Sequence, residues 1–174
     1  GASSALANER LVVIDGSLTE IVYALGAGDS IVAVDTTSLF PAAATELPNV
    51  GYMRALAAEG ILSVKPTMVI ATESAGPPQV LEHLKKTGID IQLIKNTYSV
   101  EGIYQKIDIV SGLLEQQASG AALKQAIAKE LSPVLADIKS KSVAKPKVLV
   151  FLGMQGNQLM AAGQGTQAEA VINI

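Results

Sequence analysis

Several residue types that build reactive or metal sites are scarce or absent in these 174 residues. The chain has no cysteine, which excludes disulfides, thiolate nucleophiles and cysteine-ligated metals. Its single histidine is His83, so a metal site that needs several histidines is excluded as well. Because His83 lies in a helical pattern between Leu81 and Leu84, we interpret it as a residue at the boundary of the core rather than as a ligand.

Charge and long hydrophobic runs are also modest. The net charge is −3 and the lysines are scattered, which argues against a surface for nucleic acid or for anionic membranes. The apolar runs are short and interrupted by charges, so none is expected to insert into a membrane. At 49% hydrophobic residues, the chain has enough apolar material for a core. The small-x-small sequence Ala5-Leu6-Ala7 has the form of a secretory cleavage site and favours export.

The common signatures of catalysis on nucleotide-binding or hydrolase folds are missing. After the first apolar run, the chain reads Asp15-Gly16-Ser17 instead of a Gly-x-Gly-x-x-Gly turn. There is no Gly-x-Ser-x-Gly sequence and no phosphate-loop lysine, and no nucleophile can be paired with a histidine. We therefore predict a binding protein rather than an enzyme.

Short runs of apolar, often β-branched residues alternate with helical patterns along the chain. Near-continuous apolar strands separated by helices are typical of a parallel sheet covered on both faces, so the sequence predicts an α/β fold. Ser17-Leu18-Thr19-Glu20 is a capping-box sequence that should open the first helix, and Pro77-Pro78 suits the first turn of a later one. The predicted strands are 10–15, 31–35, 67–72 and 91–95.

A long helix is predicted from Ser119 to Lys141, with a kink or break near Ser132 because Pro133 falls inside it. Beyond it, strands at 148–152 and 158–162 flank a hairpin-like 153–157, and another helix opens near 163–166. This predicts an N-terminal lobe (8–116), a connecting helix (117–145) and the beginning of a second α/β lobe (146–174). The second lobe looks incomplete, because two strands and a helix are too little to close a core.

The most informative local feature is Tyr52-Met53-Arg54, which follows the extended-looking Pro48-Asn49-Val50-Gly51. If the segment is extended, the side chains at positions 52 and 54 project to the same side. A guanidinium beside a phenol stabilises the phenolate, which is a good ligand for ferric iron. Arginine is rare in this chain, so its place beside Tyr52 indicates a task that lysine does poorly. The alternative is a packing tyrosine next to a solvated arginine.

The order of these elements resembles the periplasmic binding proteins of bacterial ABC importers whose two α/β lobes are joined by one long helix. Within that class, the chain is most similar to the branch that binds haem. The blocks Tyr52-Met53-Arg54-Ala55-Leu56 and Ala75-Gly76-Pro77-Pro78 are specific to the haem branch, and the other similar segments fit the wider class. Those segments are 11–14, 17–21, 25–29 and 160–163.

The resemblance implies roles for individual residues. Tyr52 would be the axial ligand of the haem iron, and Arg54 would pair with the phenolate or a haem propionate. Ala75, Gly76 and Pro77 would line the cleft, although the same loop also fits an ordinary helix entry. Glu59 would dock the transporter permease, where the alternative is a solvated helical carboxylate.

One departure from the resemblance concerns a second iron ligand. The loop Gly153-Met154-Gln155-Gly156-Asn157 has no histidine where some members of the branch supply one. The resemblance then implies five-coordinate haem held by tyrosine alone, with Met154 as a neighbour of the cleft.

The implied function is a periplasmic protein that captures haem and delivers it to an ABC importer in the inner membrane. An outer-membrane haem receptor would supply the ligand. A ferric-siderophore or corrinoid binding protein of the same architecture is the alternative, because such proteins share the scaffold and also place tyrosine and arginine around a cleft.

Overall fold

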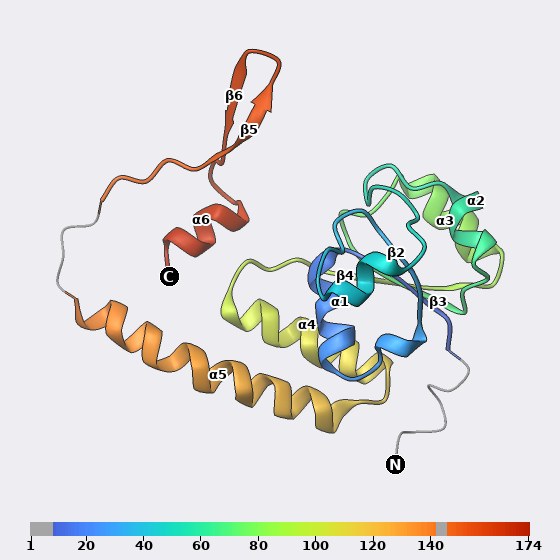
Figure 1. Ribbon diagram of the computed structural model, residues 1–174, viewed down its shortest axis with the longest axis horizontal. Coiled ribbons are helices and arrows are strands. Elements are labelled where there is room, and N and C mark those ends of the chain that lie inside the picture. The colour runs from blue at the N-terminus through green and yellow to red at the C-terminus, as the bar shows by residue number, and fades with distance from the viewer. Residues whose placement is uncertain (1–8, 142–145) are drawn as a thin grey trace.

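Four short parallel strands form the centre of the N-terminal part of the chain (Figure 1). The structure is a computed structural model that describes residues 9–141 and 146–174. The strands lie in the order β2-β1-β3-β4 and pair in parallel, so the α/β prediction is confirmed. They are β1 (Leu11–Ile14), β2 (Ile31–Val34), β3 (Met68–Thr72) and β4 (Asp90–Ile94).

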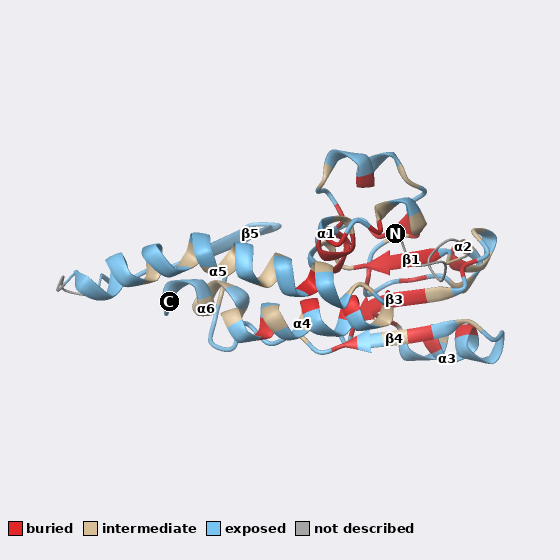
Figure 2. Cartoon of the chain, turned by 90° about the horizontal axis from the view of Figure 1, so that it is seen from below, coloured by how far each residue is buried: buried red, intermediate tan, exposed pale blue. Residues whose placement is uncertain are grey.

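Helices cover both faces of this sheet. Leu11 and Val13 on β1 pack in one core with helices α1 (Gly16–Ala24) and α4 (Val100–Leu113). Val12 and Ile14 pack in a second core with α2 (Ala58–Ser63) and α3 (Pro78–Lys86). Successive side chains of a strand point to opposite faces, so a strand covered on both sides must be apolar at every position. Figure 2 shows the buried residues gathered in this layered lobe.

Helix α1 begins two residues earlier than the capping-box prediction. Asp15, not Ser17, is the N-cap, and its carboxylate accepts a hydrogen bond from the Ser17 amide at 2.8 Å. The predicted C-terminal stop is correct, since Gly26 has a φ of 81° and follows the last turn. The amides of Gly26 and Ala27 donate to Tyr23 and Val22, which is the pattern of a Schellman cap. A 3₁₀ turn (Gly28–Ser30) then leads into β2.

The long helix α5 (Gln117–Ser140) passes through Pro133 without a break, so of the predicted kink or break near Ser132 the break is wrong and the kink stays a prediction. The Ser132 hydroxyl donates to the Ala128 carbonyl at 2.6 Å. Residues around the proline are half or fully exposed, and water can hydrate the carbonyl that loses its helical partner. The first half of α5 packs on the lobe through Leu123 and Ile127.

The C-terminal elements are the antiparallel strands β5 (Phe151–Gln155) and β6 (Gln158–Ala161), followed by helix α6 (Gln167–Ile172). The predicted turn 153–157 is too long: the strands are joined by Gly156 and Asn157 alone, and the first strand lies three residues later than expected. Two-residue hairpin turns require a residue with positive φ, and Gly156 has a φ of 60°. The glycine therefore allows the strands to be joined by two residues. Every residue of β5 and β6 is exposed, and Figure 1 shows the hairpin standing apart from the larger sheet.

The division into two lobes and a connecting helix stays a prediction. The last residues assigned to the connecting helix, 142–145, lie outside the described residues. Within the described ranges, no helix is both long enough and apolar enough to cross a bilayer.

Candidate functional site

A cavity of about 860 Å³ opens at the carboxyl ends of the four parallel strands. In open α/β sheets, ligands bind at this edge, where the strand order changes direction, which here is between β1 and β3. Each strand is followed by residues that line the cavity, and α4, α5 and α6 complete it. Its lining includes Ser17, Phe40, Arg54, Ser74, Tyr98 and Lys106.

The Tyr52–Arg54 segment is a turn rather than an extended strand. The chain before it is extended, as predicted, and pairs with β2 through Val34 and Asn49. After Gly51, whose φ is 97°, the Ala55 amide donates to the Tyr52 carbonyl at 2.8 Å and closes the turn. Met53 is buried in the core, while the Tyr52 side chain is 48% exposed and Arg54 is exposed. The two predicted site residues therefore still share the solvent side of the segment.

This turn is fixed to the loop that precedes α3. The Gly76 amide donates to the Met53 carbonyl, and the Leu56 amide donates to the Gly76 carbonyl, both at 2.9 Å. The two sequence blocks that carried the haem resemblance are thus joined by their main chains. Ala75 is buried in the core, and Pro77 stands just before the first residue of α3.

None of the predicted lining residues Ala75, Gly76 and Pro77 is among those that line this cavity, so their contact with a ligand stays a prediction. Their neighbour Ser74 lines it, and Gly76 holds the Tyr52 turn through its main chain. Tyr52 also lies outside the cavity lining. Met154 is on β5, 67% exposed and away from the lining.

The chain's two arginines have different surroundings. Arg10 donates to the carbonyls of Val64 and Lys65, at 2.7 and 2.9 Å, and so satisfies the end of α2. Within the described residues, the Arg54 guanidinium and the Tyr52 hydroxyl have no hydrogen-bond or ion-pair partner. Arg10 is structural, and Arg54 is left available at the cavity.

The buried carboxylate of Asp35 holds residues that line the cavity. Asp35, which is 1% exposed, accepts hydrogen bonds from the Asp15 amide and from the hydroxyls of Thr37 and Ser38, at 2.8 to 3.0 Å. Asp15 has a φ of 107°, a conformation that L side chains rarely adopt. Strained backbone of this kind is found where the surrounding structure holds it in place, often at binding sites.

Lys106 on α4 is a cavity residue that the sequence reasoning missed. Its ammonium donates to the Ser17 hydroxyl at 2.9 Å, and burial lowers the pKa of Lys106 while the charge of Asp15 raises it in part. The sequence does contain an indication of this role. Lys106 lies between Ile103 and Ile107 in the apolar stripe of α4, where a charged residue is unexpected.

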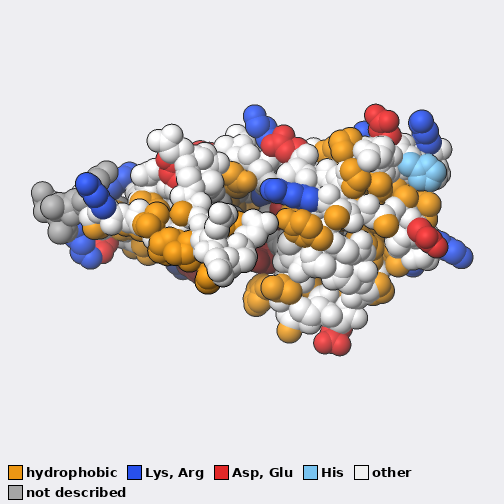
Figure 3. Space-filling view, turned by 90° about the horizontal axis from the view of Figure 1, so that it is seen from above, with side chains coloured by type: hydrophobic (Ala, Val, Ile, Leu, Met, Phe, Trp, Pro, Cys, Tyr) orange, Lys and Arg blue, Asp and Glu red, His pale blue; other side chains and the backbone are white. Residues whose placement is uncertain are grey.

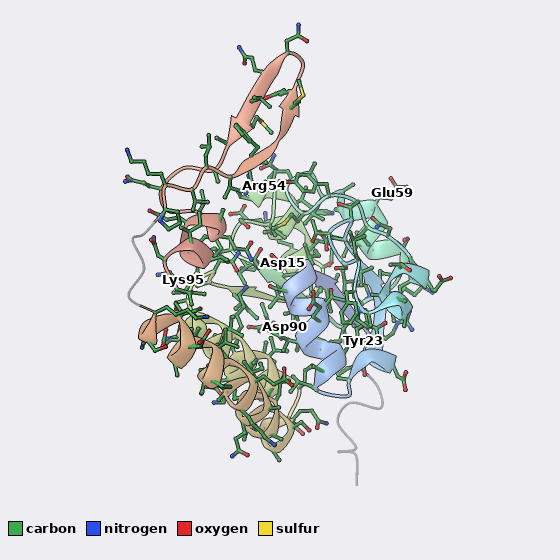
Figure 4. All side chains as sticks on the ribbon, turned by 60° about the vertical axis from the view of Figure 1, so that its left-hand side comes forward. Asp15, Tyr23, Arg54, Glu59, Asp90 and Lys95 are labelled. Atoms are coloured by element: carbon green, nitrogen blue, oxygen red, sulfur yellow. The ribbon has the colours of Figure 1, made fainter. Side chains whose placement is uncertain are left out.

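Glu59 and His83 lie away from the cavity. Glu59 is exposed in the first turn of α2 and is not a lining residue of the cavity, and Figure 4 shows it apart from Arg54 in that view. His83 is exposed in the last turn of α3 rather than at the core boundary. Among the described residues, no three histidine or acidic side chains are grouped to hold a metal ion.

The sequence profile of the periplasmic binding protein family matches residues 11–174. The chain belongs to this family. Its members are periplasmic or lipoprotein solute-binding proteins of ABC transporters, not enzymes. Two curated relatives are a vitamin B12-binding protein of Vibrio parahaemolyticus, 30% identical over 92% of this chain, and an uncharacterised substrate-binding lipoprotein of Bacillus subtilis, 28% identical over 95%. The chain spans 57% and 53% of their lengths.

Solved periplasmic binding proteins share the fold. The haem-binding protein BhuT in complex with two haems has a TM-score of 0.90 and 36% identity, over 95% of this chain and 64% of that one. The haem-binding protein RhuT of Roseiflexus sp. RS-1 has a TM-score of 0.88 and 33% identity, over 95% and 63%. The vitamin B12-binding protein BtuF of Vibrio cholerae has a TM-score of 0.66 and 30% identity, over 76% and 51%.

Proposed function

We propose that this chain captures ferric haem in the periplasm for delivery to an ABC importer. The observation that supports this function most directly is the exposed Tyr52–Ala55 turn at the carboxyl edge of the sheet, where the phenol and the guanidinium have no partner among the described residues. Its fixed position on the Gly76 loop supports the same conclusion, since a binding site benefits from preorganised backbone. Two similar solved structures are haem-binding proteins, which agrees with this ligand.

In this proposal, Tyr52 coordinates the iron as phenolate and Arg54 pairs with the phenolate or with a propionate. The positive charge of the iron supplies most of the free energy needed to remove the phenol proton. Haem is also broad and flat, and the cavity lining carries the exposed aromatic side chains of Phe40 and Tyr98, which suit contact with a conjugated ring. Ala75, Gly76, Pro77 and Met154 are secondary contacts of the same proposal.

A corrinoid is the second candidate, because curated relatives of 30% identity are named vitamin B12-binding proteins. A ferric siderophore would use the same phenol and guanidinium. Visible absorbance separates haem from a ferric siderophore, because bound haem gives a Soret band and a ferric siderophore does not.

The transporter contact would lie at Glu59, on the outer side of α2 and away from the cavity. An exposed carboxylate there can pair with an arginine of an inner-membrane permease without disturbing the ligand. An outer-membrane haem receptor would deliver the ligand to the periplasm.

Titration of the full-length protein with haem tests the site. Tyr52→Phe is expected to abolish the phenolate-to-iron charge-transfer band and to weaken haem binding sharply, because the ligand oxygen is removed with little change in shape. Arg54→Ala should weaken binding less. Tyr98→Phe is a matched control that should leave the titration unchanged, because it removes a phenol hydroxyl of similar exposure at the cavity and keeps the ring proposed to contact haem.

Glu59→Ala should leave the haem titration unchanged and weaken stimulation of the transporter. If Tyr52→Phe binds haem with wild-type affinity and an unaltered spectrum, another residue holds the iron and the proposed site is wrong. Tighter binding of cobalamin than of haem by the wild type would favour the second candidate.

A further inference from the structure

We propose that Lys106 binds a carboxylate of the ligand, so that Lys106 and Arg54 are the two cationic contacts of a dicarboxylate macrocycle. This inference rests on the proposed function and names a contact that lies on a different element from the Tyr52 turn. It assigns the cavity to ligands with two acidic side chains, such as haem and metal-free protoporphyrin.

Lys106 is positioned by its neighbours rather than by an ion pair. Its ammonium donates to the Ser17 hydroxyl at 2.9 Å, and that hydroxyl donates to the Asp15 carboxylate at 2.6 Å. Asp15 in turn caps α1, and its amide is held by buried Asp35. The chain of hydrogen bonds therefore sets the direction of a long, otherwise flexible side chain at the cavity wall.

The ammonium keeps capacity for a further acceptor. Lys106 is in neither ion pair found among the described residues, which are Lys124 with Asp108 and Lys141 with Asp137. Its hydrogen-bond partner is a neutral hydroxyl, which uses one of three ammonium protons. Burial lowers the pKa of Lys106, the sign that its charge is incompletely compensated in the unliganded protein. An anionic group entering the cavity would supply the missing partner.

The charges around the cavity favour an acid over an amide. Among the described residues, its lining contains two cations, Arg54 and Lys106, and two carboxylates, Asp15 and Glu20. Asp15 is already engaged as a helix cap and by the Ser17 hydroxyl, and Glu20 is exposed on α1. Both cations thus remain for the ligand, which suits the two propionates of haem. The ring side chains of a corrinoid are amides and would not require two cations.

The test measures quenching or enhancement of porphyrin fluorescence when the full-length protein binds metal-free protoporphyrin, which has both carboxylates and no iron. The same titration with protoporphyrin dimethyl ester removes the carboxylates. Lys106→Gln is expected to weaken protoporphyrin binding about tenfold, the scale of one partly buried charge-assisted hydrogen bond, and to leave the ester unchanged. Lys106→Arg should restore most of the affinity.

Lys129→Gln is the matched control, because it removes the same charge from an exposed position on α5 outside the cavity lining. Equal protoporphyrin affinity in the wild type and Lys106→Gln would overturn the inference, and so would equal losses for the acid and the ester. Failure of the wild type to bind protoporphyrin would overturn it as well. An iron ligand is not needed in this assay, so a wrong assignment of Tyr52 is detected separately by the haem titration.

Discussion

The four-stranded sheet and the C-terminal hairpin have similarly apolar strands with opposite burial. Leu11–Ile14 of β1 is buried at every residue, whereas Phe151–Gln155 of β5 is exposed at every residue. The sheet has helices on both faces, and the hairpin has only its own partner strand. Figure 3 shows hydrophobic side chains on the surface of the elongated C-terminal part of the molecule. An apolar pattern therefore predicts a strand, but burial depends on what covers it.

The sharpest test of this comparison is a pair of substitutions that shorten a side chain, one in each region. Ile70 is fully buried in β3, and Ile70→Ala is expected to lower the free energy of unfolding by about 2–5 kcal/mol, because it leaves a cavity in the core. Leu159 in β6 is 62% exposed, and Leu159→Ala should change stability by less than about 0.5 kcal/mol. Urea unfolding measures both. A comparable loss for Leu159→Ala would show that the hairpin is packed in solution.

A smaller effect is expected at a close backbone approach inside the lobe. A Cβ on Gly16 would lie 2.5 Å from the Thr37 carbonyl oxygen, so Gly16→Ala must shift the backbone and should cost about 1–3 kcal/mol. Gly60 in α2 has open space around its Cβ position, and Gly60→Ala should stabilise the protein by up to about 1 kcal/mol through helix propensity. Thermal unfolding distinguishes them, and equal changes for both variants would contradict this reading of the packing.

The smallest effect concerns a charge within the well-packed lobe. The pKa of Lys106 is lowered by burial, so between that value and its ordinary 10.5 the unfolded chain binds more protons than the folded one. The wild type should therefore gain stability relative to Lys106→Met as pH rises through this range. At neutral pH, the variant should be more stable by less than about 1 kcal/mol, since solvent screens a half-exposed group. Unfolding at pH 7 and pH 10.5 measures the difference, and a pH-independent difference would contradict it.

The sequence predicted the parts of this protein that depend on local pattern. The strand positions followed from β-branched apolar runs, and Gly26 marked the end of α1. The site was predicted in part: the resemblance selected Tyr52 and Arg54, and the structure gives them a common exposed turn. Lys106 and Ser17 are 89 residues apart, so their contact depends on how α1 and α4 pack and could not be derived from spacing.

Two errors have the same physical origin. Asp15 replaces Ser17 as the cap, and β5 takes in Met154. In each case, two local arrangements have similar intrinsic preference, and the surroundings choose between them. Propensities of a few tenths to about 1 kcal/mol per residue are too small to decide such cases.

The two hydrogen bonds that attach the Tyr52 turn to the Gly76 loop join peptide groups alone. Substitutions at the outward positions 52 and 54 leave both hydrogen bonds intact, since neither side chain takes part in them. The residues at positions 52 and 54 can therefore change over evolutionary time while the position of the turn that carries them is inherited. A lineage built on such a frame can acquire a new ligand by one or two substitutions without first having to rebuild the loop that displays them.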